Sequence, residues 1–194
     1  NDSEGFTATV TDGEYTNSQS FTVTFNELND APVATIGLSA ATNEDQSVVI
    51  ILTGTDVDGD ALFYSLVADT NNGNVVISGS VATYTPNADF NGSDSFTFSV
   101  NDGELTDQAS VTVVVNPVND APVLAAITDV SFDEDTSGSI SLLASDVDGD
   151  ALDFSIFGGT NITATLVVNE VTFSAPTDFN GSETFAIIVS DGEL

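Results

Sequence analysis

Two acidic motifs, each present twice, contain the residue types that bind a hard metal cation. Residues 56–60 and 146–150 both read Asp-Val-Asp-Gly-Asp, and residues 29–33 and 119–123 both read Asn-Asp-Ala-Pro-Val. Two bare carboxylates about 4 Å apart repel by roughly 4 kcal/mol at an effective dielectric constant near 20. Clusters of oxygen ligands suit a hard divalent cation, and a flexible oxygen cage usually holds calcium. The motifs therefore predict calcium at the junctions between repeated segments.

The charge balance of the chain also requires external cations. The 194 residues include 31 Asp and Glu and no Lys, Arg or His, so the formal charge is −31. No internal salt bridge can compensate these carboxylates, and self-repulsion opposes the compact state. Phosphate groups and anionic membrane surfaces are bound through Lys and Arg. We therefore expect neither nucleic acid nor a membrane to be a partner.

Apolar content is nevertheless high enough for folded cores. Hydrophobic residues make up 41% of the chain, including 13 Phe, which separates it from disordered chains of high charge. Cysteine is absent, so disulfides and thiol chemistry are excluded. No stretch approaches the roughly 18 apolar residues of a membrane span. The lack of an initiator Met and of a secretion signal is expected of a segment cut from a longer chain.

The sequence repeats with a period of 89 to 90 residues. Asp-Phe-Asn-Gly-Ser, for example, occupies residues 89–93 and returns at residues 178–182. The copies predict three parts: the C-terminal two strands of a preceding module at 1–28, a complete module at 29–118, and a module without its last strand at 119–194.

Within a module the hydrophobic pattern has the period of a β-strand. Residues 96–100, for example, alternate apolar and polar side chains. Asp-Gly, Asn-Gly and Gly-Asp turns separate short runs by about 8–12 residues, as in an all-β sandwich. The predicted strands of the complete module are 33–38, 47–53, 61–67, 74–78, 81–85, 95–101 and 109–115. We predict an all-β chain of tandem immunoglobulin-like, seven-stranded Greek-key sandwiches.

Strand direction sorts the acidic loops between the two ends of a module. If successive strands alternate along the long axis, the loops of Asp56 and Asp102 return to the linker that precedes the module, whereas those of Asp45 and Asp89 lie at the far end. At the middle junction, loops from both modules would then meet around more than one calcium ion. The predicted ligands are Asn29, Asp30, Asp56, Asp58, Asp60 and Asp102, then Glu44, Asp45, Asp89 and Asn91, then Asn119, Asp120, Asp146, Asp148, Asp150 and Asp191.

Nearly the whole chain resembles the cadherin-like tandem repeats of large bacterial surface or secreted adhesins. The Asn-Asp linker, the Asp-x-Asp loop and the late Asp-Gly all match that family. The resemblance implies calcium ligands at Glu44 and Asp89, and at Glu134 and Asp178 one module later. Two departures are Ala31 and Ala121, where animal linkers have a further Asn. Trp is absent, so the strand-swap adhesion of animal cadherins is not implied.

Each motif also has a plainer interpretation. Asp-x-Asp-Gly-Asp can be an ordinary β-turn, and Asn-Asp-Ala-Pro can be only a rigid linker. The Glu44-Asp45 pair can be solvated loop charge, while Asp60 and Asp150 can simply begin the next strand. An EF-hand is excluded, because the twelfth position of the loop is Val67 in one copy and Phe157 in the other.

Three function classes follow from these observations. The first is a calcium-rigidified spacer of a long extracellular adhesin or surface fibre, whose partners are neighbouring modules and a surface glycan or protein receptor outside this segment. The second is a carbohydrate-binding sandwich, which would need exposed aromatics. The third, an enzyme, is not expected, because the clustered carboxylates are already explained by the junctions. A variant of the first is a filament whose subunits complete one another by strand donation, since the module at 119–194 lacks its seventh strand.

Overall fold

The described chain is built from strands alone. The computed structural model describes residues 3–26 and 28–193, and every regular element in these ranges is a β-strand. Within these ranges no helix is long and apolar enough to cross a membrane. The chain divides into two compact units, Asn1–Asn116 and Pro117–Leu194. Residues 29–116 are called the first module below, and residues 119–193 the second module.

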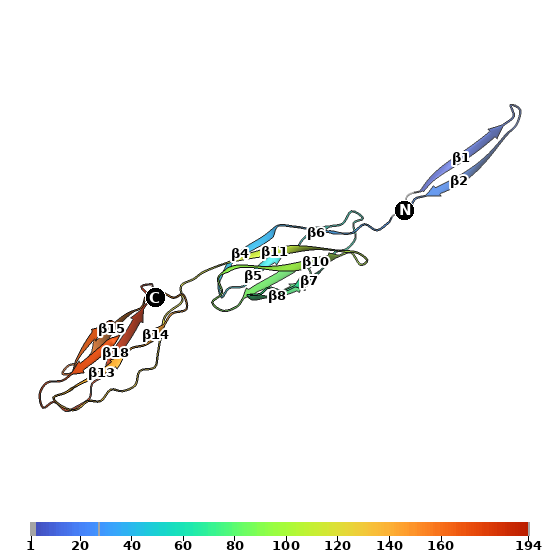
Figure 1. Cartoon of the computed structure of the whole chain (residues 1–194). Coiled ribbons are helices and arrows are strands. Elements are labelled where there is room, and N and C mark those ends of the chain that lie inside the picture. Colours follow the sequence, from blue (N-terminus) through green and yellow to red (C-terminus); the bar gives the residue numbers. More distant parts are fainter. Residues whose placement is uncertain (1–2, 27, 194) are drawn as a thin grey trace. The chain divides into compact units, whose positions relative to one another are not determined.

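An antiparallel hairpin comes first in the sequence (Figure 1). β1 (Ser3–Thr11) pairs with β2 (Thr16–Thr24), and every side chain in the two strands is exposed. The turn is closed by Asp12, whose Oδ1 accepts hydrogen bonds from the amides of Tyr15 at 2.8 Å and Glu14 at 3.0 Å. These two bonds favour the charged carboxylate and lower the pKa of Asp12.

The first module is a two-layer sandwich closed by a short strand pair (Figure 1). One sheet has the order β4 (Leu38–Asn43), β11 (Thr106–Asn116), β10 (Gly92–Asn101), β7 (Phe63–Ala68). The other has the order β5 (Val48–Ile51), β9 (Val81–Pro86), β8 (Gly73–Ser78). The short pair is β3 (Val33–Ala34) with β6 (Gly54–Thr55). The predicted all-β, immunoglobulin-like sandwich is confirmed.

The alternating pattern of β11 explains the core of this module. Ala109, Val111, Val113 and Val115 all point inward, none more than 6% exposed, while the residues between them face solvent. Phe98 on the neighbouring β10 is fully buried among them. Burial of such side chains away from water is the main term that stabilises a sandwich.

The predicted first strand at 33–38 is wrong in its extent. The chain forms only β3 at its start, breaks at Gly37, where φ is +76°, and then begins β4 at Leu38. β4 runs parallel to β11, with Leu38 opposite Val111. The first segment thus changes from one sheet to the other, and glycine permits the left-handed turn that this change requires. The predicted second strand at 47–53 contains β5, and β6 begins just after the end of that range.

The second module repeats most of this arrangement. Its three-stranded sheet has the order β13 (Ser137–Ser141), β17 (Glu170–Ser174), β16 (Thr163–Val167). The opposite sheet contains β15 (Asp153–Gly158) and β18 (Phe185–Ser190), and a short pair joins β12 (Val123–Leu124) to β14 (Ala144–Ser145).

The core of the second module is more open than that of the first. Leu142 and Val171 are buried, but Phe185 and Ile187 on β18 are only partly covered. β18 corresponds to β10, yet among the described residues it pairs only with β15. One edge of this sheet is therefore unpaired within the described chain.

Candidate metal centre

The linker and two distant loops meet at one end of the first module. We call this group of six residues the linker pole; it consists of Asn29, Asp30, Asp56, Asp58, Asp60 and Asp102. Asn29 Nδ2 donates a hydrogen bond to Asp102 Oδ2 at 3.0 Å, and the amide of Asp30 donates to Asp58 Oδ2 at 2.8 Å. The predicted sorting of the loops by strand direction is thus confirmed at this end of the module.

Asp56 is held so that only one of its carboxylate oxygens is satisfied. Its Oδ1 accepts the amides of Asp58, Gly59 and Asp60 at 2.9, 3.0 and 3.3 Å. Its Oδ2 is buried and has no hydrogen-bond partner among the described residues. One carboxylate oxygen from each of Asp56, Asp58 and Asp60 lies within 4.8 Å of the others. A buried anionic oxygen without a donor is costly unless a cation compensates it.

The second module builds the same linker pole from its own residues. Asn119 Nδ2 donates to Asp191 Oδ2 at 2.8 Å, and the amide of Asp120 donates to Asp148 Oδ2 at 2.8 Å. Asp146 Oδ1 accepts the amides of residues 148, 149 and 150 at 3.0, 3.1 and 3.3 Å. Asp146 Oδ2 is again buried without a hydrogen-bond partner in the described chain. One carboxylate oxygen each from Asp146, Asp148 and Asp150 also lies within 4.8 Å of the other two.

Asp102 is kept ionised by its own turn. Its Oδ1 accepts the amides of Leu105 and Glu104, each at 2.7 Å. These bonds, with a smaller contribution from Asn29, lower the pKa of Asp102. Asp102 is charged at neutral pH, as an ordinary Asp is, and these bonds favour its ionised form at lower pH as well.

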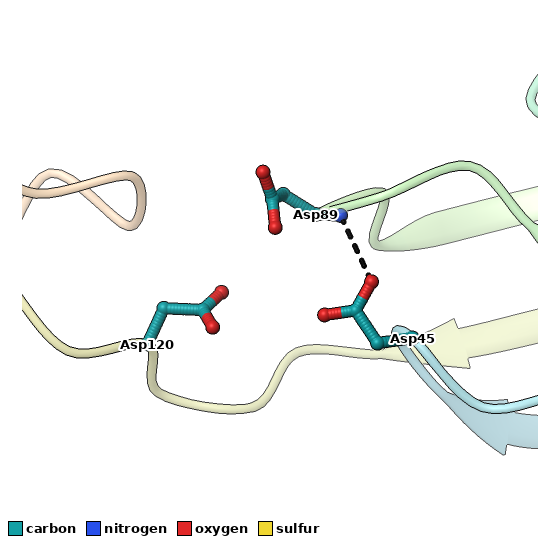
Figure 2. Close-up of side chains that lie close together, drawn as sticks. All are labelled: Asp45, Asp89 and Asp120. Atoms are coloured by element: carbon teal, nitrogen blue, oxygen red, sulfur yellow. Dashed lines mark hydrogen bonds between the residues drawn. The ribbon is translucent and has the colours of Figure 1, made fainter.

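The far pole of the first module, which we define as Glu44, Asp45, Asp89 and Asn91, is a second acidic group. Asp45 Oδ1 accepts the amide of Asp89 at 3.3 Å, which joins the two loops (Figure 2). Asp45 and Asp89 have φ values of +58° and +57°, the left-handed conformation that Asp tolerates better than most residues. Glu44 is only 3% exposed, and its amide donates to the carbonyl of Asn116 at 2.9 Å. Asn91 is exposed and precedes β10.

The far pole of the second module is only partly equivalent. Asp135 Oδ1 accepts the amide of Asp178 at 3.4 Å, matching the contact between Asp45 and Asp89. Glu134, in contrast to Glu44, is exposed. Glu44 is bonded to the end of β11 through its amide, whereas no described strand takes that place in the second module. The prediction that loops of consecutive modules share ions stays a prediction.

The linker poles fit a hard divalent cation. Each offers several carboxylate oxygens and, at Asp56 or Asp146, one buried oxygen that has no donor among the described residues. Calcium takes six to eight oxygen ligands at about 2.3–2.6 Å. The remaining ligands would come from the Asn and Asp side chains of the same pole and from water.

Comparison with known proteins identifies the modules. Residues 29–114 and 119–194 match the sequence profile of the bacterial Ig domain. The chain belongs to the bacterial Ig domain family. These Ig domains are 33% identical over 162 residues to a chitinase A of Pseudoalteromonas piscicida, a match that covers 78% of this chain and 19% of that protein. The chain thus spans about a fifth of the curated relative that it matches.

Solved structures place the two Ig domains among cadherin-like sandwiches. The first two extracellular domains of human protocadherin-24 align with a TM-score of 0.52 at 17% identity, covering 84% of this chain and 95% of that one. Extracellular cadherin domains 1–4 of protocadherin gamma B7 align with a TM-score of 0.50 at 14% identity, covering 97% of this chain and 57% of that one. The predicted resemblance to bacterial cadherin-like, immunoglobulin-like repeats is confirmed.

Sequence reasoning overlooked one acidic position in each Ig domain. Asp94 is 6% exposed and accepts the amide of Asn72 at 3.0 Å and the hydroxyl of Tyr84 at 3.2 Å. Burial of Tyr84, together with the negative charge of Asp94, raises the pKa of Tyr84 to about 12. Glu183 is the equivalent residue of the second domain. An acidic residue two positions after Asn-Gly in both copies was the signal that could have revealed this role.

Proposed function

We propose that this chain is a calcium-binding structural spacer of a long extracellular or cell-surface protein. The observation that supports it most strongly is the buried, unpaired Oδ2 of Asp56 and Asp146 inside an acidic pole of each module. A chain of formal charge −31 with no Lys, Arg or His needs an external cation to stabilise such a carboxylate.

Binding at the linker pole explains how calcium would stiffen the chain. Asn29 and Asp30 belong to the linker, and they already hydrogen bond to Asp102 and Asp58 of the module that follows. An ion held by the same carboxylates would fix the direction in which the linker leaves the module. We propose that Glu44, Asp45, Asp89 and Asn91 complete the coordination at the next junction, where more than one ion binds.

A second candidate is suggested by the similarity to chitinase A. In that case these modules would either separate other domains of a secreted polysaccharide-degrading enzyme or bind its carbohydrate substrate directly. The second role, direct binding of chitin, is tested by incubating the chain with insoluble chitin in calcium and in EDTA. Retention on chitin would support the carbohydrate-binding function, and its absence would favour the spacer.

Calcium binding is tested by comparing thermal unfolding in calcium and in EDTA at equal ionic strength. Ligand that binds only the folded state stabilises it by about 2.7 kcal/mol per site at a hundredfold excess over Kd. We expect a higher Tm in calcium for the native chain. The Asp56→Asn, Asp146→Asn double variant should lose most of this difference, because Asn can still accept the loop amides but has no negative charge.

The matched control is the double variant Asp69→Asn, Asp129→Asn. It removes the same number of charges, one in each module and outside both poles. Asp69 also accepts backbone amides, from Thr70 at 2.8 Å and Val75 at 3.1 Å, so it controls for local turn effects. Equal calcium responses in both double variants would contradict the assignment of Asp56 and Asp146 as ligands.

A further inference from the structure

We infer that Asn91 is a site of spontaneous deamidation, a modification that adds a carboxylate to the far pole of the first module. The inference is independent of the proposed calcium site. It starts from the dipeptide Asn-Gly, which occurs at residues 72–73, 91–92 and 180–181. The first two copies lie in the same module but in different surroundings, and this difference decides which of them can react.

Deamidation at Asn-Gly needs only the chain itself and water. The backbone nitrogen of the glycine attacks Cγ of the Asn side chain and a C–N bond forms. The side-chain amide group then leaves as ammonia, together with the proton of the glycine nitrogen. Water opens the resulting five-membered succinimide to Asp or to its isomer isoaspartate. Glycine hinders the attacking nitrogen least, because it has no side chain, so the reaction depends on how freely the Asn-Gly peptide can turn.

The peptide between Asn91 and Gly92 has room to turn. Asn91 lies directly before β10, outside any strand, and both residues are exposed. A side-chain carbon built on Gly92 would come no nearer than 3.6 Å to any residue beyond its chain neighbours, the closest being the ring of Phe90. Gly92 is also the last rung of the ladder between β10 and β11, opposite Val115, and pairing opens most readily at strand ends.

Asn72 and Gly73 show the opposite arrangement. The amide of Asn72 donates to Asp94 Oδ2 at 3.0 Å, and the carbonyl of Asn72 accepts the amide of Asn87 at 2.8 Å. Gly73 lies against Tyr84, where a side-chain carbon built on the glycine would be 2.5 Å from the aromatic ring. Rotation of this peptide would break the bond to Asn87. Asn72 should therefore react only when its turn opens locally.

The product carboxylate would change the charge of the far pole. Glu44, Asp45 and Asp89 already supply three carboxylates there, and Asp45 Oδ1 accepts the amide of Asp89 at 3.3 Å. The chain has no Lys, Arg or His to compensate a fourth carboxylate. Deamidation of Asn91 is therefore a slow, irreversible increase of negative charge at this end of the module.

Mass spectrometry of the whole chain, aged in calcium-free neutral buffer at physiological temperature, tests the inference. Each conversion replaces an amide by a carboxyl group and releases one ammonia, and fragmentation of the intact chain locates it. We expect residue 91 to convert about tenfold or more faster than residue 72, because Asn72 must first leave its bonded turn. In concentrated urea the two residues should convert at similar rates, since both are then unfolded Asn-Gly peptides.

Asn91→Gln is the matched control. Glutamine keeps the side-chain amide but is one carbon longer and closes its ring far more slowly. Conversion at residue 91 should therefore fall to background, while the rate at residue 72 stays unchanged. Equal rates at residues 72 and 91 in the folded chain would overturn the inference. A residue 91 that stays unconverted in the folded chain but converts in urea would overturn it as well.

Discussion

At the residue scale, the acidic side chains have two different structural roles. Those of the linker poles, such as Asp56, are crowded together and leave a buried oxygen without a donor. Asp94 and Glu183 are instead satisfied by several backbone amides or by Tyr84. The first arrangement is one that a bound cation would stabilise, whereas the hydrogen bonds of the second already stabilise a loop.

Glu183 should make the stability of the second module depend on pH. Its carboxylate accepts the amides of Thr160 at 2.7 Å, Asn161 at 2.9 Å and Ile162 at 2.9 Å, which lower its pKa from 4.5 to about 2. A lowered pKa stabilises the folded state above pH 4.5, and this contribution is lost as the pH falls toward 2. We therefore expect Glu183→Gln to destabilise the second module at neutral pH but to have little effect near pH 2.

The measurement is urea unfolding of both proteins across this pH range. Glu104→Gln removes one charge from an exposed loop of the first module and serves as the control. A constant difference between the native chain and Glu183→Gln at every pH would show that the amide contacts of Glu183 do not depend on its charge.

At the scale of elements, β10 and β18 are the same strand in two different environments. β10 lies between β7 and β11, and its Phe98 is fully buried. β18 has only β15 beside it in the described chain, and its equivalent Ile187 is partly exposed. The cost of removing a core side chain depends on how closely its surroundings pack.

Phe98→Ala should therefore be far more disruptive than Ile187→Ala. Replacing a fully buried Phe by Ala costs about 3–5 kcal/mol, which is a large part of the stability of a small domain. We expect a smaller loss for Ile187→Ala, because one side of its site is already open. Calorimetry of the whole chain would measure both losses of stability.

At the scale of the whole molecule, charge repulsion and ion binding oppose each other. Without cations, 31 carboxylates with no positive partner repel one another throughout the chain. Exposed charges are screened by any salt, because the Debye length falls to about 8 Å at physiological ionic strength. Stabilisation by a coordinated ion is different, because the affinity of the site depends on the number and geometry of its ligands rather than on ionic strength.

Chelation should therefore loosen the linkers but leave the sandwich cores folded. We expect small-angle scattering to report a broader distribution of maximum dimensions in EDTA than in calcium, with little change in the far-ultraviolet circular dichroism. Magnesium at the same concentration should be less effective, because it requires near-octahedral geometry and dehydrates reluctantly. Identical scattering in calcium and EDTA would contradict the spacer proposal.

The amino-acid sequence is enough to predict the β class, the repeat and most of the candidate ligand positions. Period-two alternation leaves strands little choice of face, and the Asp-Gly and Asn-Gly turns fix where most strands end. The same local patterns predicted one strand at 33–38, and this is wrong because Gly37 allows the chain to turn there and join a different sheet. Whether it does so depends on which strand pairs with β11, a long-range contact. These patterns also could not distinguish Glu44, which is buried and hydrogen bonded to Asn116 of β11, from its exposed repeat Glu134.

Long-range packing, which the sequence pattern does not reveal, sets which carboxylates lack a donor among the described residues and which are satisfied. Asp56 and Asp94 are the same residue type. Asp94 accepts hydrogen bonds from Asn72 and Tyr84, whereas Oδ2 of Asp56 is buried and has no partner among the described residues. Burial and long-range pairing depend on the whole module, so no local pattern of residues specifies them.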